Sequence, residues 1–125
     1  MGAKEVGQKL VALCQQGKNL ECLDTLYDKN AESIEAVAMP EMPARMKGVD
    51  AIKKKSEWWF ANNEMHGGST KGPFPNGDRF AVIYNYDVTP KSGPMAGKRT
   101  QMEEVGLYTV KGGKIVKEEF FYGRG

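Results

Sequence analysis

Histidine and cysteine are scarce in this sequence, with one His and two Cys among 125 residues. The single histidine, His66, does not stand at metal-ligand spacing from Cys14 or Cys22, so we expect neither a metal nor a cofactor. Both cysteines lie in stretches of helical periodicity, where reduced and at least half-buried thiols are expected. Reduced cysteines favour the cytoplasm as the compartment.

A strong net charge and a long apolar run are also missing. Lysine and arginine total 18 against 16 acidic residues, which leaves a net charge of +2. Nucleic acid is not an expected partner, because phosphate binding needs a concentrated basic face. The dense basic run at residues 53–55 is interpreted as the solvated side of a helix. No apolar run approaches the ~20 residues that cross a bilayer, so no membrane partner is expected.

The first part of the chain has helical periodicity. Apolar residues recur at helical spacing over residues 6–14, and Gly17 is placed to end that helix. Asn19 is expected to cap a second helix. The apolar stripe of this second helix consists of Leu20, Leu23, Leu26 and Tyr27. A third helix is expected over about residues 48–62, with Trp59 on its apolar face.

The later part of the chain has the period of two that is typical of strands. A first short strand is predicted at residues 31–38, between the second and third helices. Further strands are predicted after Glu64 and over residues 79–89, 98–110 and 115–122, with a turn cluster at residues 72–78. Helices followed by strands indicate an α+β fold, and the length predicts a single domain over residues 1–125.

Four short segments, in the right order along the chain, resemble those of one known superfamily. They are residues 26–31 (LYDKNA), 47–52 (KGVDAI), 77–82 (GDRFAV) and 113–119 (GKIVKEE). The chain is therefore identified as similar to the SnoaL-like and NTF2-like superfamily, which includes relatives of polyketide cyclases and ketosteroid isomerases. The resemblance implies a cystatin-like cone, with three N-terminal helices packed on a curved, mainly antiparallel mixed sheet. It also implies a ligand pocket inside the cone and, often, a homodimer.

Alternation along the strands separates an inner face of the sheet from an outer face. The inner face is expected to carry Phe80, Val82, Tyr84, Tyr86, Glu104 and Tyr108. In the last strand the resemblance sets the register and places Glu118, Phe120 and Tyr122 inward. The outer face keeps the apolar residues Ile83, Val105, Leu107 and Phe121. Because such a patch is costly on a monomer, we expect a homodimer through the outer face of the sheet.

Four residues are candidates for catalytic proton transfer: Glu35, His66, Glu104 and Glu118. An apolar pocket raises the pKa of a glutamate toward the range useful for proton transfer. The resemblance gives Glu35 the place of the aspartate that is the general base in ketosteroid isomerases. His66 titrates near neutrality unaided, and forms an acid/base pair if its ring reaches Glu35 or Glu118. The carboxylates could instead be structural charges paired with Arg45, His66 or a lysine.

Eight apolar or aromatic residues are predicted to bind the substrate. They are Tyr27, Trp59, Phe80, Val82, Tyr84, Tyr108, Phe120 and Tyr122. The tyrosine hydroxyls either orient a polar ligand or belong to plain core aromatics. Residues 39–46, which are rich in Met and Pro, are either a lid over the pocket or a surface loop.

The sequence also departs from the ketosteroid isomerase pattern. By the resemblance, Val11 and Gly106 stand where those enzymes have their two acid donors to the enolate oxygen, so steroid isomerisation by that mechanism is not expected. The function predicted is a small-molecule pocket protein, with acid/base chemistry of an isomerase, cyclase or dehydratase on a compact apolar substrate bearing a carbonyl or hydroxyl. The alternative is a non-catalytic ligand-binding or dimeric interaction module. Whether the chain is an enzyme stays open on these residues.

Overall fold

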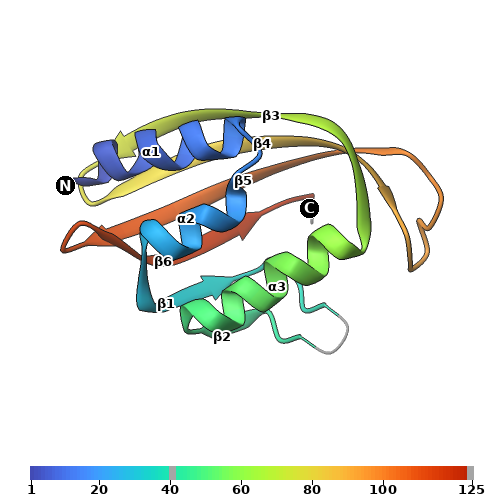
Figure 1. Ribbon diagram of the computed structural model, residues 1–125, viewed down its shortest axis with the longest axis horizontal. Coiled ribbons are helices and arrows are strands. Elements are labelled where there is room, and N and C mark those ends of the chain that lie inside the picture. Colours follow the sequence, from blue (N-terminus) through green and yellow to red (C-terminus); the bar gives the residue numbers. More distant parts are fainter. Residues whose placement is uncertain (40–41, 124–125) are drawn as a thin grey trace.

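The computed structural model describes residues 1–39 and 42–123. Its elements are α1 (Ala3–Gln15), α2 (Asn19–Thr25), β1 (Tyr27–Ile34), β2 (Arg45–Lys47), α3 (Val49–Ala61), β3 (Asn63–Asn76), β4 (Arg79–Pro90), β5 (Thr100–Lys111) and β6 (Lys114–Phe121). The predicted α+β order, with the helices first and the long strands last, is confirmed. Figure 1 shows the helices on one side of a curved sheet.

The six strands form one mixed sheet in the order β2-β1-β6-β5-β4-β3. Strands β1 and β6 run parallel, whereas the other neighbouring pairs are antiparallel. Helix α1 packs against β3 and β4 at one end of this order, and α3 packs against β1 at the other. The helices therefore cover the inner face from both ends, and β5 and β6 lie between them. The cystatin-like, NTF2-like cone is confirmed.

The boundary between α2 and β1 differs from the prediction. Tyr27 begins β1, where it pairs with Ile115 of β6, and does not continue the stripe of α2. The first strand accordingly spans Tyr27–Ile34 and not residues 31–38. Lys18 precedes α2 as its cap residue, so Asn19 is the first residue of that helix and not its cap. The side-chain amide of Asn19 donates to the Cys14 sulfur. Parallel pairing with a distant strand is a tertiary interaction that local periodicity does not reveal.

The turn cluster predicted at residues 72–78 is mostly strand. Strand β3 continues to Asn76, with a register shift between Lys71 and Phe74, and only Gly77 and Asp78 form the turn. This is possible because β3 is an edge strand. Pro73 and Pro75 have no backbone N–H to donate, and an edge strand needs no donor on its open side. The short strand β2 occupies the other edge and was not predicted.

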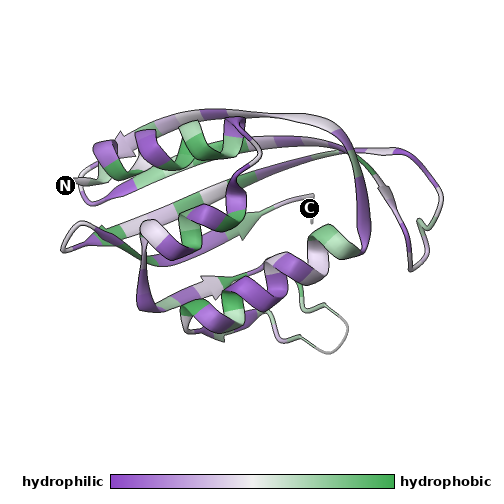
Figure 2. Ribbon diagram, in the orientation of Figure 1, coloured by the Kyte–Doolittle hydropathy of each residue, from purple (hydrophilic) through white to green (hydrophobic). Residues whose placement is uncertain are grey.

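The main core fills the end of the cone beneath α1. Its largest fully buried members include Val6 and Leu10 of α1 and Phe80 and Val82 of β4. The helix lies so close to the sheet that a Cβ on Gly7 would stand 2.7 Å from the Cβ of Pro73. Figure 2 shows hydrophobic and hydrophilic bands alternating along the helices and strands, as expected for elements with one buried face. A cavity lies beside this main core, further along the same strands.

The outer face of the sheet carries the predicted apolar residues. Ile83, Val105 and Leu107 are half-buried in the single chain, and Phe121 is 53% exposed. The homodimer through this face stays a prediction. None of the helices in residues 1–39 and 42–123 has the length and apolar character needed to cross a bilayer. The proposed lid falls partly on residues 40 and 41, which lie outside the described residues.

Candidate functional site

A pocket with a cavity volume of about 130 Å³ lies between the helices and the inner face of the sheet. Helices and strands from all parts of the chain contribute to its wall. Of the residues predicted from the sequence, those that line it are Tyr27, Glu35, Trp59, Tyr84, Glu104, Tyr108, Glu118 and Phe120. The three inward carboxylates therefore share one cavity with five of the predicted aromatic residues.

Four predicted site residues lie outside this pocket. Phe80 and Val82 have the predicted inward orientation, but they are fully buried in the core beneath α1. Tyr122 follows the end of β6 and is not part of the pocket wall. His66 is exposed on β3, where its Nε2 atom lies 2.7 Å from the hydroxyl of Thr89. Its predicted pairing with Glu35 or Glu118 is therefore not formed.

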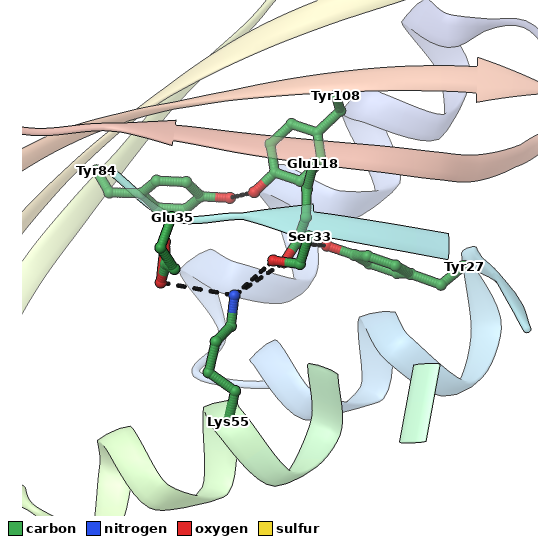
Figure 3. Close-up of polar contacts among 7 residues, drawn as sticks. All are labelled: Tyr27, Ser33, Glu35, Lys55, Tyr84, Tyr108 and Glu118. Atoms are coloured by element: carbon green, nitrogen blue, oxygen red, sulfur yellow. Dashed lines mark hydrogen bonds and ion pairs between the residues drawn. The ribbon is translucent and has the colours of Figure 1, made fainter. Parts of the chain in front are cut away.

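Lys55 of α3 is the centre of the polar network in the pocket (Figure 3). Its side chain is only 7% exposed, and its Nζ atom lies 3.5 Å from both Glu35 Oε1 and Glu118 Oε2. The same ammonium donates to Ser33 Oγ, and Ser33 in turn donates to Glu118 Oε2 at 2.5 Å. Tyr27 donates its hydroxyl hydrogen to the other oxygen of Glu118. Both oxygens of Glu118 are thus engaged by groups of the protein.

The burial of Lys55 corrects the interpretation of residues 53–55 as a solvated run. Lys54 is exposed as expected, but Lys55 lies three residues after the buried Ile52 and four before Trp59. Those spacings put Lys55 on the inner face of α3. The helical period therefore indicated that Lys55 faces inward. Its residue type favoured an exposed position, since a lysine is almost never fully buried unless it is paired. Its partners come from β1 and β6 and could not be identified locally.

Glu35, which follows β1, has a buried carboxylate oxygen that no group of the described residues contacts through a hydrogen bond. Its Oε1 faces Lys55, whereas its Oε2 is buried and has no hydrogen-bond partner among the described residues. Burial raises the pKa of Glu35, Lys55 opposes that rise, and the charge of Glu118 adds to it. A buried oxygen without a partner is costly, so this position is suited to a group supplied by a ligand.

Glu104 of β5 is the carboxylate with the most strongly raised pKa. Burial raises the pKa of Glu104 to about 7, and the nearby charge of Glu35 contributes in the same direction. No hydrogen bond or ion pair holds its side chain within the described residues. Glu104 therefore changes between its acid and its carboxylate form near neutral pH, which is the behaviour required of a general acid or base.

Two tyrosines add hydroxyl groups to the wall. The hydroxyls of Tyr84 and Tyr108 are hydrogen-bonded to each other, and both side chains are buried. One hydroxyl hydrogen is used in that bond, which leaves the second hydrogen for another acceptor. Gly106 makes the arrangement possible, because a Cβ there would lie 2.9 Å from the ring of Tyr108. A tyrosine ring thus fills the space beside the position at which the resemblance expects an acid side chain.

Several wall residues were not predicted as site residues. Besides Lys55 they include Cys14, Asn19, Cys22, Ser56 and Tyr86. Tyr86 was predicted to face inward but was not named as a site residue. The two cysteines were expected to be reduced and at least half-buried thiols in helices, and helical periodicity alone does not show which side of a helix faces a cavity. Within the described residues, no group of three His, Cys, Asp or Glu side chains is placed to hold a metal ion.

Comparison with known proteins agrees with the fold of this chain. A sequence model of the SnoaL-like domain family matches residues 1–122. A proposed SnoaL-like polyketide cyclase from Mesorhizobium loti, also designated a carbohydrate phosphatase, is 43% identical, with 94% of this chain and 97% of that chain covered and a TM-score of 0.86. No curated protein sequence matches the chain.

More distant solved structures share the fold alone. An NTF2-like protein from Burkholderia thailandensis is 15% identical, with 98% of this chain and 92% of that chain covered and a TM-score of 0.81. A proposed isomerase from Bacillus subtilis is 18% identical, with 97% of this chain and 86% of that chain covered and a TM-score of 0.71. The family match over nearly the whole chain, together with the 43% identity to the Mesorhizobium protein, shows that the chain belongs to the SnoaL-like domain family.

Proposed function

We propose that this protein is an acid/base catalyst that moves a proton on a small, largely apolar substrate bearing a carbonyl or hydroxyl group. The observation that carries the proposal is Oε2 of Glu35, which is buried in the wall of an aromatic pocket and has no hydrogen-bond partner in residues 1–39 and 42–123. A carboxylate oxygen in that state is available to accept a proton from a substrate and is shielded from competing water.

The pocket supplies distinct roles for its two less constrained carboxylates. Glu35 acts as the base, because Lys55 at 3.5 Å opposes the rise in its pKa that burial causes. Glu104 has its pKa raised to about 7, holds a proton in a large fraction of molecules at neutral pH and acts as the acid. Two carboxyl groups whose surroundings favour different protonation states are a recurrent arrangement in proton-transfer enzymes.

The tyrosine pair supports the same chemistry. When Glu35 removes a proton from a carbon next to a carbonyl, negative charge develops on the carbonyl oxygen. The remaining hydroxyl hydrogen of the Tyr84–Tyr108 pair can be donated to that oxygen. Glu104 or the newly protonated Glu35 then returns a proton to another atom of the substrate, so that atoms and charge balance. Isomerisations, cyclisations and dehydrations of carbonyl compounds all contain such a step.

The alternative is a ligand-binding protein without catalysis. It is favoured by Glu118, whose two oxygens are occupied by Tyr27, Ser33 and Lys55 and which therefore has a structural role. In that case the whole polar network would serve to shape the pocket.

Exchange of carbon-bound hydrogen distinguishes the two functions. A panel of small linear and cyclic ketones is incubated with the protein in deuterated water, and loss of the proton next to the carbonyl is followed by NMR. We expect wild type to accelerate exchange and Glu35→Gln to lose about 10²–10⁴-fold of that acceleration. Glu32→Gln, at a half-exposed position paired with Arg45, is the matched control and should retain it. No acceleration over buffer on any ketone would contradict catalysis and favour binding alone.

A further inference from the structure

The pocket wall contains more negatively charged than positively charged side chains. Three carboxylates, Glu35, Glu104 and Glu118, face the single ammonium group of Lys55 in the described wall. Glu118 takes hydrogen bonds from Tyr27 and Ser33 and is paired with Lys55, so its charge is compensated. The uncompensated acceptors are Glu104 and Glu35 Oε2, which come from β5 and from the end of β1. The pocket therefore lacks positive charge.

The aromatic part of the wall is suited to a cation. Trp59 and Tyr86 stand with their ring centres 5.3 Å apart, and Tyr84 is stacked on Tyr86 at 5.9 Å. The same wall already holds one ammonium group over an aromatic face, because Lys55 Nζ lies 5.2 Å from the ring centre of Phe120. Aromatic faces attract ammonium groups through the negative charge above the ring, and the attraction strengthens when the pair is shielded from water.

The size and donor set of the cavity favour an organic cation over a metal ion. Ca²⁺ and Mg²⁺ need about six or more oxygen ligands, whereas only two carboxyl groups here are uncompensated, and aromatic carbon surrounds them. An apolar cavity of about 150 Å³ binds benzene, so a cavity of about 130 Å³ has room for a small alkylated ammonium group.

We propose that this pocket selects ligands that carry an ammonium group, which binds against Glu104 and Glu35 Oε2 while the apolar part of the ligand lies against Trp59 and Tyr86. The inference rests on the proposed function and deepens it, because the substrate would carry this positive charge as well as its carbonyl or hydroxyl. With such a substrate Glu104 binds the ammonium as a carboxylate, and the newly protonated Glu35 is the group that returns the proton. Binding of the cation does not itself require catalysis.

The groups around Glu104 also predict how binding depends on pH. Burial and the charges of Glu35 and Glu118 raise the pKa of Glu104, and Lys55 of α3 lowers it. Burial also raises the pKa of the Tyr86 and Tyr122 hydroxyls, and the charge of Glu104 adds to that rise. A bound ammonium favours the carboxylate form of Glu104. Binding should therefore strengthen as the pH rises through about 7, the pKa of Glu104 in the free protein, and a proton should be released on binding.

Two probes of nearly equal shape test the selectivity. Isobutylamine, which is protonated at pH ~8 and has N–H donors for Glu35 Oε2, is compared with its neutral isostere isobutanol by calorimetric titration of the full chain at that pH. We expect isobutylamine to bind at least about tenfold more tightly, since the two molecules differ mainly in charge. Glu104→Gln should lose most of this preference and its pH dependence, whereas the neighbouring exposed Glu103→Gln should keep both. Circular dichroism is the control that checks whether each variant remains folded.

Equal or tighter binding of isobutanol, or no binding of isobutylamine at pH ~8, would overturn the inference. Each outcome is separable from failure of the proposed function. Exchange of hydrogen on neutral ketones without any preference for the amine would leave the acid/base function standing and remove the cation. A preference for the amine in a protein that exchanges no ketone hydrogen would keep the cation site and remove the catalysis.

Discussion

The inner and outer faces of β5 and β6 carry the same residue type in opposite surroundings. Glu104 and Glu118 face the pocket, and their sequence neighbours Glu103 and Glu119 face outward. The side chain of Glu118 is 4% exposed, against 27% for Glu119, which lies 3.6 Å from Lys117 near the surface. One residue along a strand thus decides whether a glutamate is solvated or belongs to a buried network. Lys54 and Lys55 repeat the contrast on α3.

The largest expected effect comes from removing the buried cation. Lys55→Met leaves Glu35 and Glu118 without their shared ammonium group, so the free energy of unfolding should fall by about 3–5 kcal/mol. The neighbouring Lys54→Met, on the exposed side of α3, should change it by less than about 0.5 kcal/mol. Urea unfolding at neutral pH measures both. Similar values for the two variants would mean that the network around Lys55 contributes nothing to stability.

A smaller effect of opposite sign is expected at Glu104. Because the folded protein holds the pKa of Glu104 at about 7, above its ordinary value of 4.5, its carboxyl group stays protonated over a range in which the unfolded chain has released the proton. The free energy of unfolding of wild type should therefore fall as the pH rises from about 4.5 to 7. Glu104→Gln keeps a neutral side chain and should be more stable than wild type by about 1–3 kcal/mol at pH ~8.

The matched control for that prediction is Glu103→Gln on the exposed side of β5. Urea unfolding across this pH range should give parallel curves for Glu103→Gln and wild type. If Glu104→Gln also stays parallel to wild type, Glu104 is ionised at its ordinary pKa and does not supply the acid.

The tyrosine pair gives a smaller difference between the two faces of β4. Tyr84→Phe removes one partner of the buried hydrogen bond to Tyr108, which should cost about 1 kcal/mol of unfolding free energy. Asn85, the next residue, faces outward and makes a long, exposed bond of 3.4 Å to Ser69. Asn85→Ala should therefore cost less than Tyr84→Phe in the same denaturation experiment. A larger loss at Asn85 would reverse the assignment of inner and outer faces.

The smallest effect on folding is expected on the outer face of the sheet. Phe121 is 53% exposed in the single chain, so Phe121→Ser should change the free energy of unfolding of the monomer by about 0.5 kcal/mol or less. If the predicted homodimer forms through this face, the same change should shift the mass measured by light scattering from dimer toward monomer. A wild-type chain that scatters as a monomer would contradict the dimer.

The comparison also shows how far local sequence patterns reach. Alternation correctly predicted that Glu104 and Tyr84 face inward, because the side-chain period of a strand is fixed by its backbone. Alternation does not say how far along the strand the cavity lies. Phe80 and Val82 were therefore assigned to the pocket, although α1 packs on that part of β4 and makes it core. Helix α1 packs there because Gly7 lies close to Pro73. These two residues are 66 positions apart in the sequence, so no local pattern predicts their contact.

The sequence alone determined the family, the order of the elements and the face on which most side chains lie, since these follow from helical and strand periods and from short motifs. The tertiary structure decided which of those side chains meet. It brought Lys55 from a helix to Ser33 and Glu118 on two strands, because a buried ammonium is stable only where several acceptors converge. It also buried Glu35 Oε2 where none of the described residues donates a hydrogen bond to it, which depends on distances between elements, and the proposed chemistry begins at this oxygen.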